Sequence, residues 1–155
     1  VRNDNGAPAG QQTRAWAAYD STTLYIAVAC ADSEPESIVA RQDAYGGDVW
    51  CDDSIEVFLD RGHGHQTFSQ FIVNGAGAKQ PAEGWQAVAQ RTESGWTVEI
   101  AIPLPVPPEP GEMWGLNLCR NRPARPQSPA EHSTWAPLEG TFHQPGCFRH
   151  LVFAR

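Results

Sequence analysis

The sequence predicts an all-β fold, an antiparallel β-sandwich with immunoglobulin-like or jelly-roll-like layers and almost no helix. Three observations support this prediction. Apolar and polar residues alternate with a period of two along most of the chain. The 14 Gly and 13 Pro residues divide the chain into short apolar segments, as turns between strands do. The length of 155 residues suits a single domain, and no internal repeat or linker divides it.

Each strand is expected between two turn signals. The first alternating segment, residues 14–19, ends at Asp20-Ser21, and the second, residues 24–30, ends before Pro35. Further strands are expected, in chain order, at residues 54–60, 67–74, 85–90, 96–102, 113–120 and 151–153. Two proline-rich connections, residues 103–110 and 123–146, separate the last of these strands and are not expected to be helical.

Charge and hydropathy exclude two classes of partner. The chain has 18 acidic and 11 basic residues and a formal net charge of −7. Without a basic stripe it has no electrostatic surface for a phosphate backbone, so nucleic acid is not an expected partner. No apolar stretch approaches the roughly 20 residues that a membrane-spanning helix needs, so no membrane partner is expected.

The four cysteines lack the short spacings of zinc or c-type haem sites. Two disulfides are compatible with the expected strands, Cys51–Cys147 between loops and Cys30–Cys119 between strands. Free buried thiols are the alternative, because a domain of this length can fold without disulfides.

Catalysis is not expected. Glycoside hydrolysis needs two carboxylates that face each other, and Glu56 and Glu99 are strand residues that could in principle serve. They are more simply explained as surface or sheet-lining carboxylates. His63 and His65 flank a glycine without nearby carboxylates, which is typical of solvated histidines rather than of a metal centre.

Two aromatic residues lie in polar loops, where no apolar periodicity explains them. Trp50 lies in the turn of residues 46–53, and Phe142 lies in the turn of residues 140–145. A sugar presents apolar C–H faces and a rim of hydroxyl groups, so a sugar site needs flat aromatic rings with carboxylates and amides around them. Trp50 and Phe142 are therefore candidates for sugar stacking, or they close the end of the sandwich.

At this point the sequence resembles a known family. The run Asp52-Asp53-Ser54-Ile55-Glu56-Val57-Phe58-Leu59-Asp60 is similar to the core of the family 9 carbohydrate-binding modules. The other matching segments follow in family order: residues 24–28 with Asp32, residues 70–74 with Gly77, residues 95–103, residues 114–117, and residues 142–145 with Phe148 and Leu151. The resemblance covers nearly the whole chain from Thr13 onward.

The resemblance implies a β-sandwich attached to xylanases and other secreted polysaccharide-degrading proteins, which holds a sugar end between two aromatic rings. Trp50 and Phe142 occupy the positions of these rings. Glu56 and Asn74 match polar residues that hydrogen-bond the sugar, and Gln70 is a further candidate. We therefore expect polysaccharide or oligosaccharide as the partner.

The sequence departs from the family at three positions that bear on the sugar site. Ile72 replaces the arginine that contacts the sugar, Cys119 replaces an amide, and Arg122 stands where a carboxylate is expected. These departures remove much of the hydroxyl recognition, so the family's sugar specificity is not carried over.

The resemblance also bears on metal, location and context. Some family members bind structural calcium, and Asp32, Asp52 and Asp60 are candidate ligands, with turn-capping aspartates as the alternative. No other cofactor is expected. The family's opening strand has no counterpart here, which predicts one module of a larger secreted or periplasmic protein with further domains.

Two other functions remain open at the level of sequence. Related sandwiches hold haem b through Met, His or Lys, and this chain has one Met, Met113, and one Lys, Lys79. Alternatively, the module is structural or adhesive and has lost its sugar site, as Ile72 and Cys119 allow.

Overall fold

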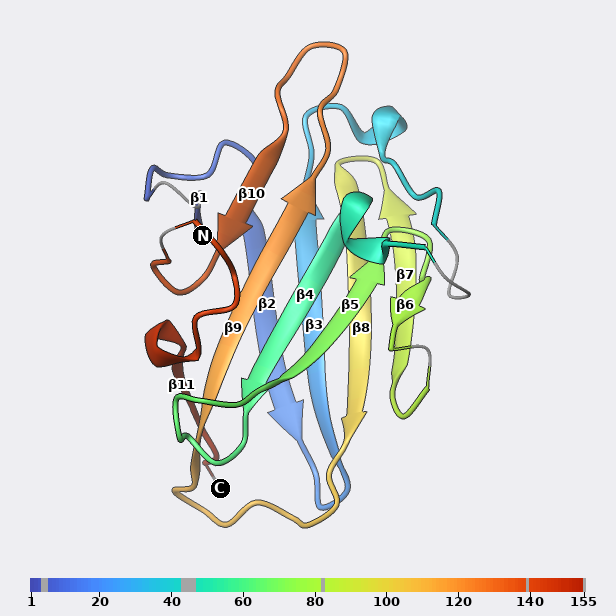
Figure 1. Ribbon diagram of the computed structural model, residues 1–155. Helices are drawn as coiled ribbons and strands as arrows, with labels where there is room; N and C mark the ends of the chain where they lie inside the picture. The colour runs from blue at the N-terminus through green and yellow to red at the C-terminus, as the bar shows by residue number, and fades with distance from the viewer. Residues whose placement is uncertain (4–5, 43–46, 82, 139, 155) are drawn as a thin grey trace.

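The computed structural model describes residues 1–3, 6–42, 47–81, 83–138 and 140–154. In this part of the chain, eleven strands form two antiparallel sheets, and three short 3-10 helices lie in the loops between them (Figure 1). The predicted all-β sandwich is confirmed. Among the same residues, no helix has the length and hydropathy needed to cross a bilayer.

The larger sheet has the strand order β1–β10–β9–β4–β5–β6, and β11 lies beside β9 on the same edge as β10. The smaller sheet has the order β2–β3–β8–β7 and lies behind the larger one in Figure 1. The strands of the larger sheet are β1 (Arg2–Asn3), β4 (Ser54–Asp60), β5 (Ser69–Asn74), β6 (Lys79–Gln80), β9 (Met113–Arg122), β10 (Glu131–Thr134) and β11 (Arg149–Val152). Those of the smaller sheet are β2 (Thr13–Tyr19), β3 (Thr23–Ala31), β7 (Gln86–Thr92) and β8 (Gly95–Pro103).

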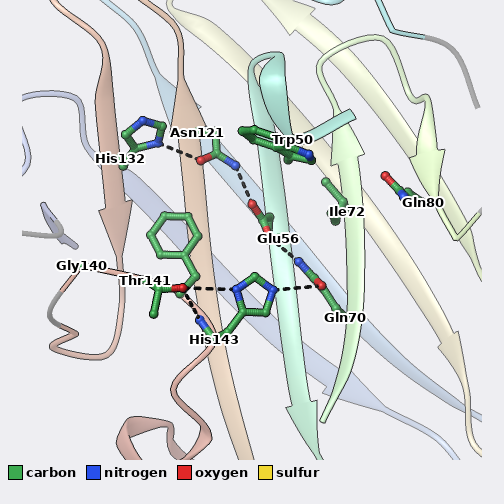
Figure 2. A pocket seen from close by; sticks show the side chains of 11 residues that line it. Trp50, Glu56, Gln70, Ile72, Gln80, Asn121, His132, Gly140, Thr141 and His143 are labelled. Carbon is green, nitrogen blue, oxygen red and sulfur yellow. Dashed lines mark hydrogen bonds between the residues drawn. The ribbon is translucent and has the colours of Figure 1, made fainter. Parts of the chain in front are cut away.

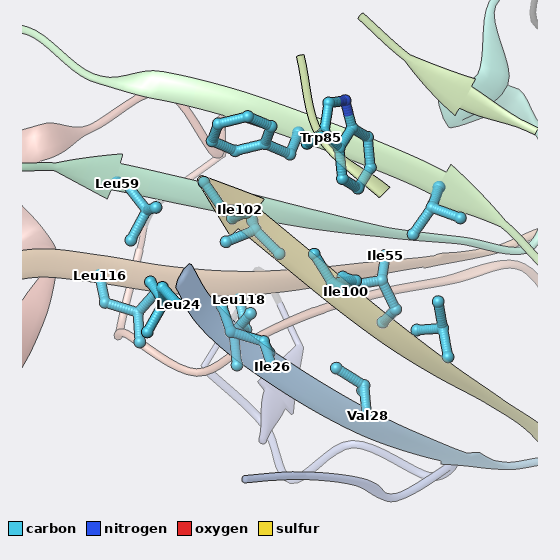
Figure 3. Close-up of a cluster of buried hydrophobic side chains, with 14 of the residues drawn as sticks. Leu24, Ile26, Val28, Ile55, Leu59, Trp85, Ile100, Ile102, Leu116 and Leu118 are labelled. Atoms are coloured by element: carbon cyan, nitrogen blue, oxygen red, sulfur yellow. The ribbon is translucent and has the colours of Figure 1, made fainter. Parts of the chain in front are cut away.

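The core lies between the two sheets and follows from the alternation in the sequence. Every second residue of a strand faces the opposite sheet, and these residues are almost all aliphatic or aromatic. They include Leu24, Ile26 and Val28 from β3, Val98, Ile100 and Ile102 from β8, Ile55, Val57 and Leu59 from β4, and Leu116 and Leu118 from β9 (Figure 3). Burying these side chains supplies the main driving force for folding.

The outer face of the larger sheet is partly covered by loops. All seven residues of β4 are buried, including those that point away from the core. A second cluster of buried apolar residues covers part of this face, and it consists of Phe58, Cys119, Ala136, Leu138 and Phe148. The candidate site lies on the remaining part of this face.

Strands β1, β6 and β10 were not predicted from the sequence, β9 is longer than predicted, and the ends of most other strands shift by one or two residues. Strand β9 continues two residues beyond the predicted end at Arg120, because β10 pairs with its last four residues. Strand β10 lies within the connection that the prolines predicted to be irregular, and its polar sequence shows no apolar alternation. Strand β6 has only two residues, too few to show a period.

Neither candidate disulfide forms, and all four cysteines are free, as the alternative had it for the buried pair Cys30 and Cys119. Cys30 points into the core between the sheets, whereas Cys119 belongs to the cluster on the outer face of the larger sheet. The larger sheet therefore separates the two buried thiols. Cys51 and Cys147 are exposed in different 3-10 helices, η2 (Val49–Cys51) and η3 (Pro145–Cys147).

Candidate functional site

A pocket of about 540 Å³ lies on the outer face of the larger sheet. Strands β4, β5, β6, β9 and β10 form its floor, and two loops form its walls. The residues that line it are Trp50, Glu56, Gln70, Ile72, Gln80, Asn121, His132, Gly140, Thr141, Phe142 and His143 (Figure 2). Residues that lie directly opposite each other on paired antiparallel strands point to the same face, so side chains from five strands meet here.

Glu56 lies at the centre of the pocket floor. Its side chain points away from the core because Ile55 and Val57 on either side point into it. It is only 4% exposed, yet both of its carboxylate oxygens accept hydrogen bonds. Gln70 Nε2 donates to Oε2 and Asn121 Nδ2 donates to Oε1, each at 2.6 Å. These two bonds compensate the burial of the carboxylate.

The two amides are in turn bonded to histidines. Asn121 Oδ1 lies 2.8 Å from His132 Nδ1, on the neighbouring strand β10. Gln70 Oε1 lies 3.4 Å from Nε2 of His143, which comes from a loop. A row of polar side chains therefore crosses the sheet from His132 through Asn121 and Glu56 to Gln70, and His143 joins it at Gln70 from its loop (Figure 2). We refer to these five residues as the polar row.

Two aromatic residues stand above the polar row. Trp50 lies in η2, which packs against β4 and β5 and is anchored by the buried Val49. The Trp50 side chain is 48% exposed, an unusual state for an indole. Phe142 is half-buried near the opposite edge of the sheet, where its ring lies 6.4 Å from that of His132. The two rings thus come from different loops, Trp50 beside β4 and β5 and Phe142 beside His132 on β10.

The pocket brings together four of the five residues predicted to bind sugar, which are Trp50, Phe142, Glu56 and Gln70. The fifth, Asn74, lies at the end of β5 and does not line it. Asn74 Nδ2 donates to Asp52 Oδ2 at 2.9 Å, and its Oδ1 accepts the backbone N–H groups of Ala76 and Ala78. Its side chain is fully buried and shapes the turn that follows the strand.

The three aspartates proposed as calcium ligands lie apart and are engaged with protein groups. Asp52 Oδ2 accepts the backbone N–H groups of Arg41 and Gln42, and Asp60 Oδ2 accepts that of His65. Asp32 is paired with arginines, as described below. Among the residues that the structure describes, no cluster of three His, Cys, Asp or Glu side chains is arranged to hold a metal ion. The turn-capping alternative describes Asp52 and Asp60 better.

Asp32 lies in a buried ion cluster between the sheets. Arg122 bonds both of its carboxylate oxygens at 2.9 Å, and Arg120 and Arg125 approach at 3.4 and 3.2 Å. Arg125 also bonds Asp53 at 2.6 Å. Burial alone would raise the pKa of Asp32, but hydrogen bonds, first of all from Arg122, outweigh it, and the pKa falls from 3.8 to about 2. Both carboxylate oxygens of Asp32 are therefore engaged by guanidinium groups.

The sequence reasoning missed several residues that line the pocket. Asn121 fell outside the predicted strand, which was expected to end at Arg120. His132 lies on the unpredicted strand β10, and Gln80 on the equally unpredicted β6. The signal available for Asn121 was strand alternation. Asn121 lies two residues beyond Cys119 and therefore points to the same face, and Cys119 is the cross-strand partner of Glu56. His143 follows Phe142 directly, so the aromatic candidate already marked its loop.

The positions of the remaining candidates bear on the alternative functions. Glu99 is exposed on the outer face of the smaller sheet, so the whole sandwich separates it from Glu56. These two carboxylates do not form a hydrolytic pair. Met113 lies on β9 and Lys79 on β6, with β4 and β5 between the two strands, and Lys79 Nζ donates to the Trp85 carbonyl. The two candidate haem ligands therefore do not converge.

The fold and the pocket define a β-sandwich of the binding-module class, in which aromatic and amide side chains surround a carboxylate on one sheet face. A family model described as "Carbohydrate family 9 binding domain-like" matches residues 2–152, and the chain belongs to this family. The resemblance seen in the sequence is therefore confirmed.

Solved structures share the fold. Two of them show a family 9 carbohydrate-binding module from Caldicellulosiruptor kristjanssonii, one in complex with glucose and one with cellotriose. The glucose complex has 17% identity and a TM-score of 0.75, with 96% of this chain and 80% of that chain covered. The cellotriose complex has 18% identity and a TM-score of 0.77, with 96% and 77% covered. No curated protein matches the chain.

Proposed function

We propose that this chain is a non-catalytic carbohydrate-binding module whose pocket holds a sugar between Trp50 and Phe142, above Glu56. The pocket itself carries the proposal, since it combines a half-exposed indole with a buried carboxylate. The indole face offers an apolar surface for the C–H groups of a sugar ring. Glu56 keeps free lone pairs after accepting one hydrogen bond from each of two amides, and these lone pairs can accept hydrogen bonds from sugar hydroxyl groups.

Three further observations support the proposal. The family to which the chain belongs is one of carbohydrate-binding domains. Structures of similar fold bind glucose and cellotriose, which are therefore the first ligands to test. The separation of Glu56 from Glu99 supports binding without hydrolysis.

We also propose that the module acts outside the cytoplasm and tethers a larger secreted protein, such as a xylanase, to polysaccharide. Family membership supports this role. An aromatic platform that binds one sugar end with modest affinity is sufficient for tethering, because attachment raises the effective concentration of the rest of the polypeptide at its substrate.

Isothermal titration with glucose, cellobiose and cellotriose, with pull-down on insoluble polysaccharides, tests the proposal. Trp50→Ala is expected to lower the affinity at least tenfold, about 1.4 kcal/mol, because an aromatic anchor commonly dominates such a site. Trp16→Ala is the matched control, since Trp16 is 58% exposed but lies on β2 in the smaller sheet. If no sugar binds, or if Trp50→Ala binds as tightly as the wild type, the proposal is wrong and the structural or adhesive alternative is favoured.

A further inference from the structure

The polar row has a definite hydrogen-bond direction. An ionised carboxylate only accepts hydrogen bonds, so the NH₂ group of each flanking amide must face Glu56. The opposite orientation would place an amide oxygen 2.6 Å from a carboxylate oxygen on either side. The amide oxygens of Asn121 and Gln70 therefore face away from Glu56, and they point toward His132 and His143.

This direction fixes the tautomer of each histidine. Asn121 Oδ1 can only accept, so His132 must carry a proton on Nδ1. Gln70 Oε1 can only accept, so His143 must carry a proton on Nε2. In neutral His143, Nδ1 then accepts from the Thr141 hydroxyl, which lies 3.4 Å away. The two histidines of one pocket are thus held in opposite tautomers by one carboxylate.

The same two histidines also hold the aromatic wall. The His143 ring packs edge-on against Phe58, with ring centroids 5.4 Å apart, and so ties the loop that carries Phe142 to the sheet. The ring of Phe142 in turn packs against His132. Each imidazole therefore links the orientation of an amide to the position of Phe142.

We propose that His132 and His143 are positioning residues of the sugar site, which hold the two amides that donate to Glu56, and that the negative charge of Glu56 makes this site select uncharged sugars over uronic acids. This inference rests on the function proposed above. The amide donors beside Glu56 are already used, so the pocket floor offers acceptors, which suit sugar hydroxyl groups. Among the described residues that line the pocket none is Lys or Arg, and Ile72 is the cross-strand neighbour of Glu56. When both pocket histidines are neutral, as imidazoles ordinarily are at pH 8, a sugar carboxylate would therefore meet the charge of Glu56 without a compensating cation.

The tautomers can be measured on the free protein, without any sugar. Two-bond ¹H–¹⁵N spectra at pH 8, where imidazoles are ordinarily neutral, distinguish Nδ1–H from Nε2–H. We expect His132 as the Nδ1–H form and His143 as the Nε2–H form. Glu56→Gln is expected to abolish this fixed pair, because a glutamine can donate as well as accept. If either histidine of the wild type carries its proton on the other nitrogen, the inferred hydrogen-bond direction of the polar row is wrong.

Titrations with glucose, cellobiose and glucuronate test the selectivity. The wild type is expected to bind glucuronate at least tenfold more weakly than glucose, and Glu56→Gln is expected to narrow this difference below threefold. Equal affinity of the wild type for the two sugars would overturn the inference. Binding of none of the three sugars would overturn the proposed function, while the tautomer measurement would still test the hydrogen-bond direction of the polar row.

Substitutions of the histidines separate positioning from folding. His132→Ala is expected to weaken glucose binding three- to tenfold, and His143→Ala somewhat less because its bond to Gln70 is longer. His132→Gln should restore most of the affinity, since its amide NH₂ can still donate to Asn121. His150→Gln is the control, because His150 lies on β11 outside the pocket. If His132→Ala binds like the wild type, or His132→Gln is no better than His132→Ala, the positioning role is wrong.

Discussion

Glu56 and Asp32 are both buried carboxylates, and their surroundings give them different roles. Guanidinium groups surround Asp32 and use both of its oxygens, so its charge stabilises the fold. The partners of Glu56 are neutral amides, which take only one lone pair from each of its oxygens. Glu56 therefore keeps lone pairs that can accept hydrogen bonds from a ligand. Because both carboxylates are buried, it is the type of partner, amide or guanidinium, that distinguishes their roles.

The four cysteines lead to a prediction at the scale of single residues. Cys51 and Cys147 are exposed, whereas Cys30 and Cys119 are buried, and burial raises the pKa of Cys30 to about 12. Since the thiolate is the reactive form, we expect two thiols to react quickly with Ellman's reagent in the native protein. All four should react after denaturation without reductant. Fewer than four in the denatured protein would reveal a disulfide and contradict the free thiols.

At the scale of elements, strands with clear alternation were predicted well from the sequence. The segment Ser54–Asp60 has the predicted bounds, because its apolar face packs into the core and turn residues flank it. Strand β10 was not predictable in this way, since its Glu-His-Ser-Thr sequence is placed by pairing with β9 rather than by its own hydropathy.

The candidate site likewise contains residues with a local sequence signal and residues without one. Trp50 and Phe142 were identifiable because they are large aromatic residues in polar loops, where no apolar alternation explains them. His132 was not identifiable, and Asn121 had only its alternation with Cys119 as a signal, because their role arises only when β9, β10 and β4 lie side by side. Cross-strand neighbours that are distant in sequence leave no local signal.

The start of β8 gives a prediction at this scale. Gly95 has φ +143°, and a Cβ atom there would lie 2.0 Å from the carbonyl oxygen of Cys30 on β3. Gly95→Ala must therefore separate the two central strands of the smaller sheet. We expect it to lower the free energy of unfolding by about 3 kcal/mol or more, measured by urea denaturation.

Gly64→Ala is the matched control for Gly95→Ala. A Cβ atom at Gly64 would meet nothing within 4 Å, so its effect should stay within about 0.5 kcal/mol. Similar urea midpoints for the two variants would show that β3 and β8 do not need the glycine.

At the scale of the whole molecule, the buried ion cluster joins the two sheets at one end of the sandwich. Asp32 directly follows β3 of the smaller sheet, whereas Arg120 and Arg122 belong to β9 of the larger one. Arg125 comes from the proline-rich connection after β9 and reaches both Asp32 and Asp53. The cluster thus lies between the sheets, while the pocket lies on the outer face, so the two sets of charges can be altered separately.

This arrangement predicts how stability depends on pH. The pKa of Asp32 is lowered from 3.8 to about 2, because its hydrogen bonds, chiefly from Arg122, outweigh the effect of burial. A carboxyl whose pKa is lower in the folded state stabilises the fold above its unfolded pKa, and this stabilisation is lost as the pH falls through its folded pKa. Asp32 should therefore contribute roughly 2 kcal/mol at neutral pH, which disappears between about pH 4 and pH 2.

Urea denaturation of the wild type and of Asp32→Asn at pH 7, 4, 3 and 2 measures this contribution. Asp32→Asn should be less stable at pH 7, because it leaves buried guanidinium groups without their anion, and its stability should fall less steeply between pH 4 and 2. Glu99→Gln, which removes an exposed carboxylate of the smaller sheet, should keep the wild-type slope. An unchanged acid slope in Asp32→Asn would mean that other carboxyl groups govern acid unfolding, and that the ion cluster is not what holds the two sheets together at low pH.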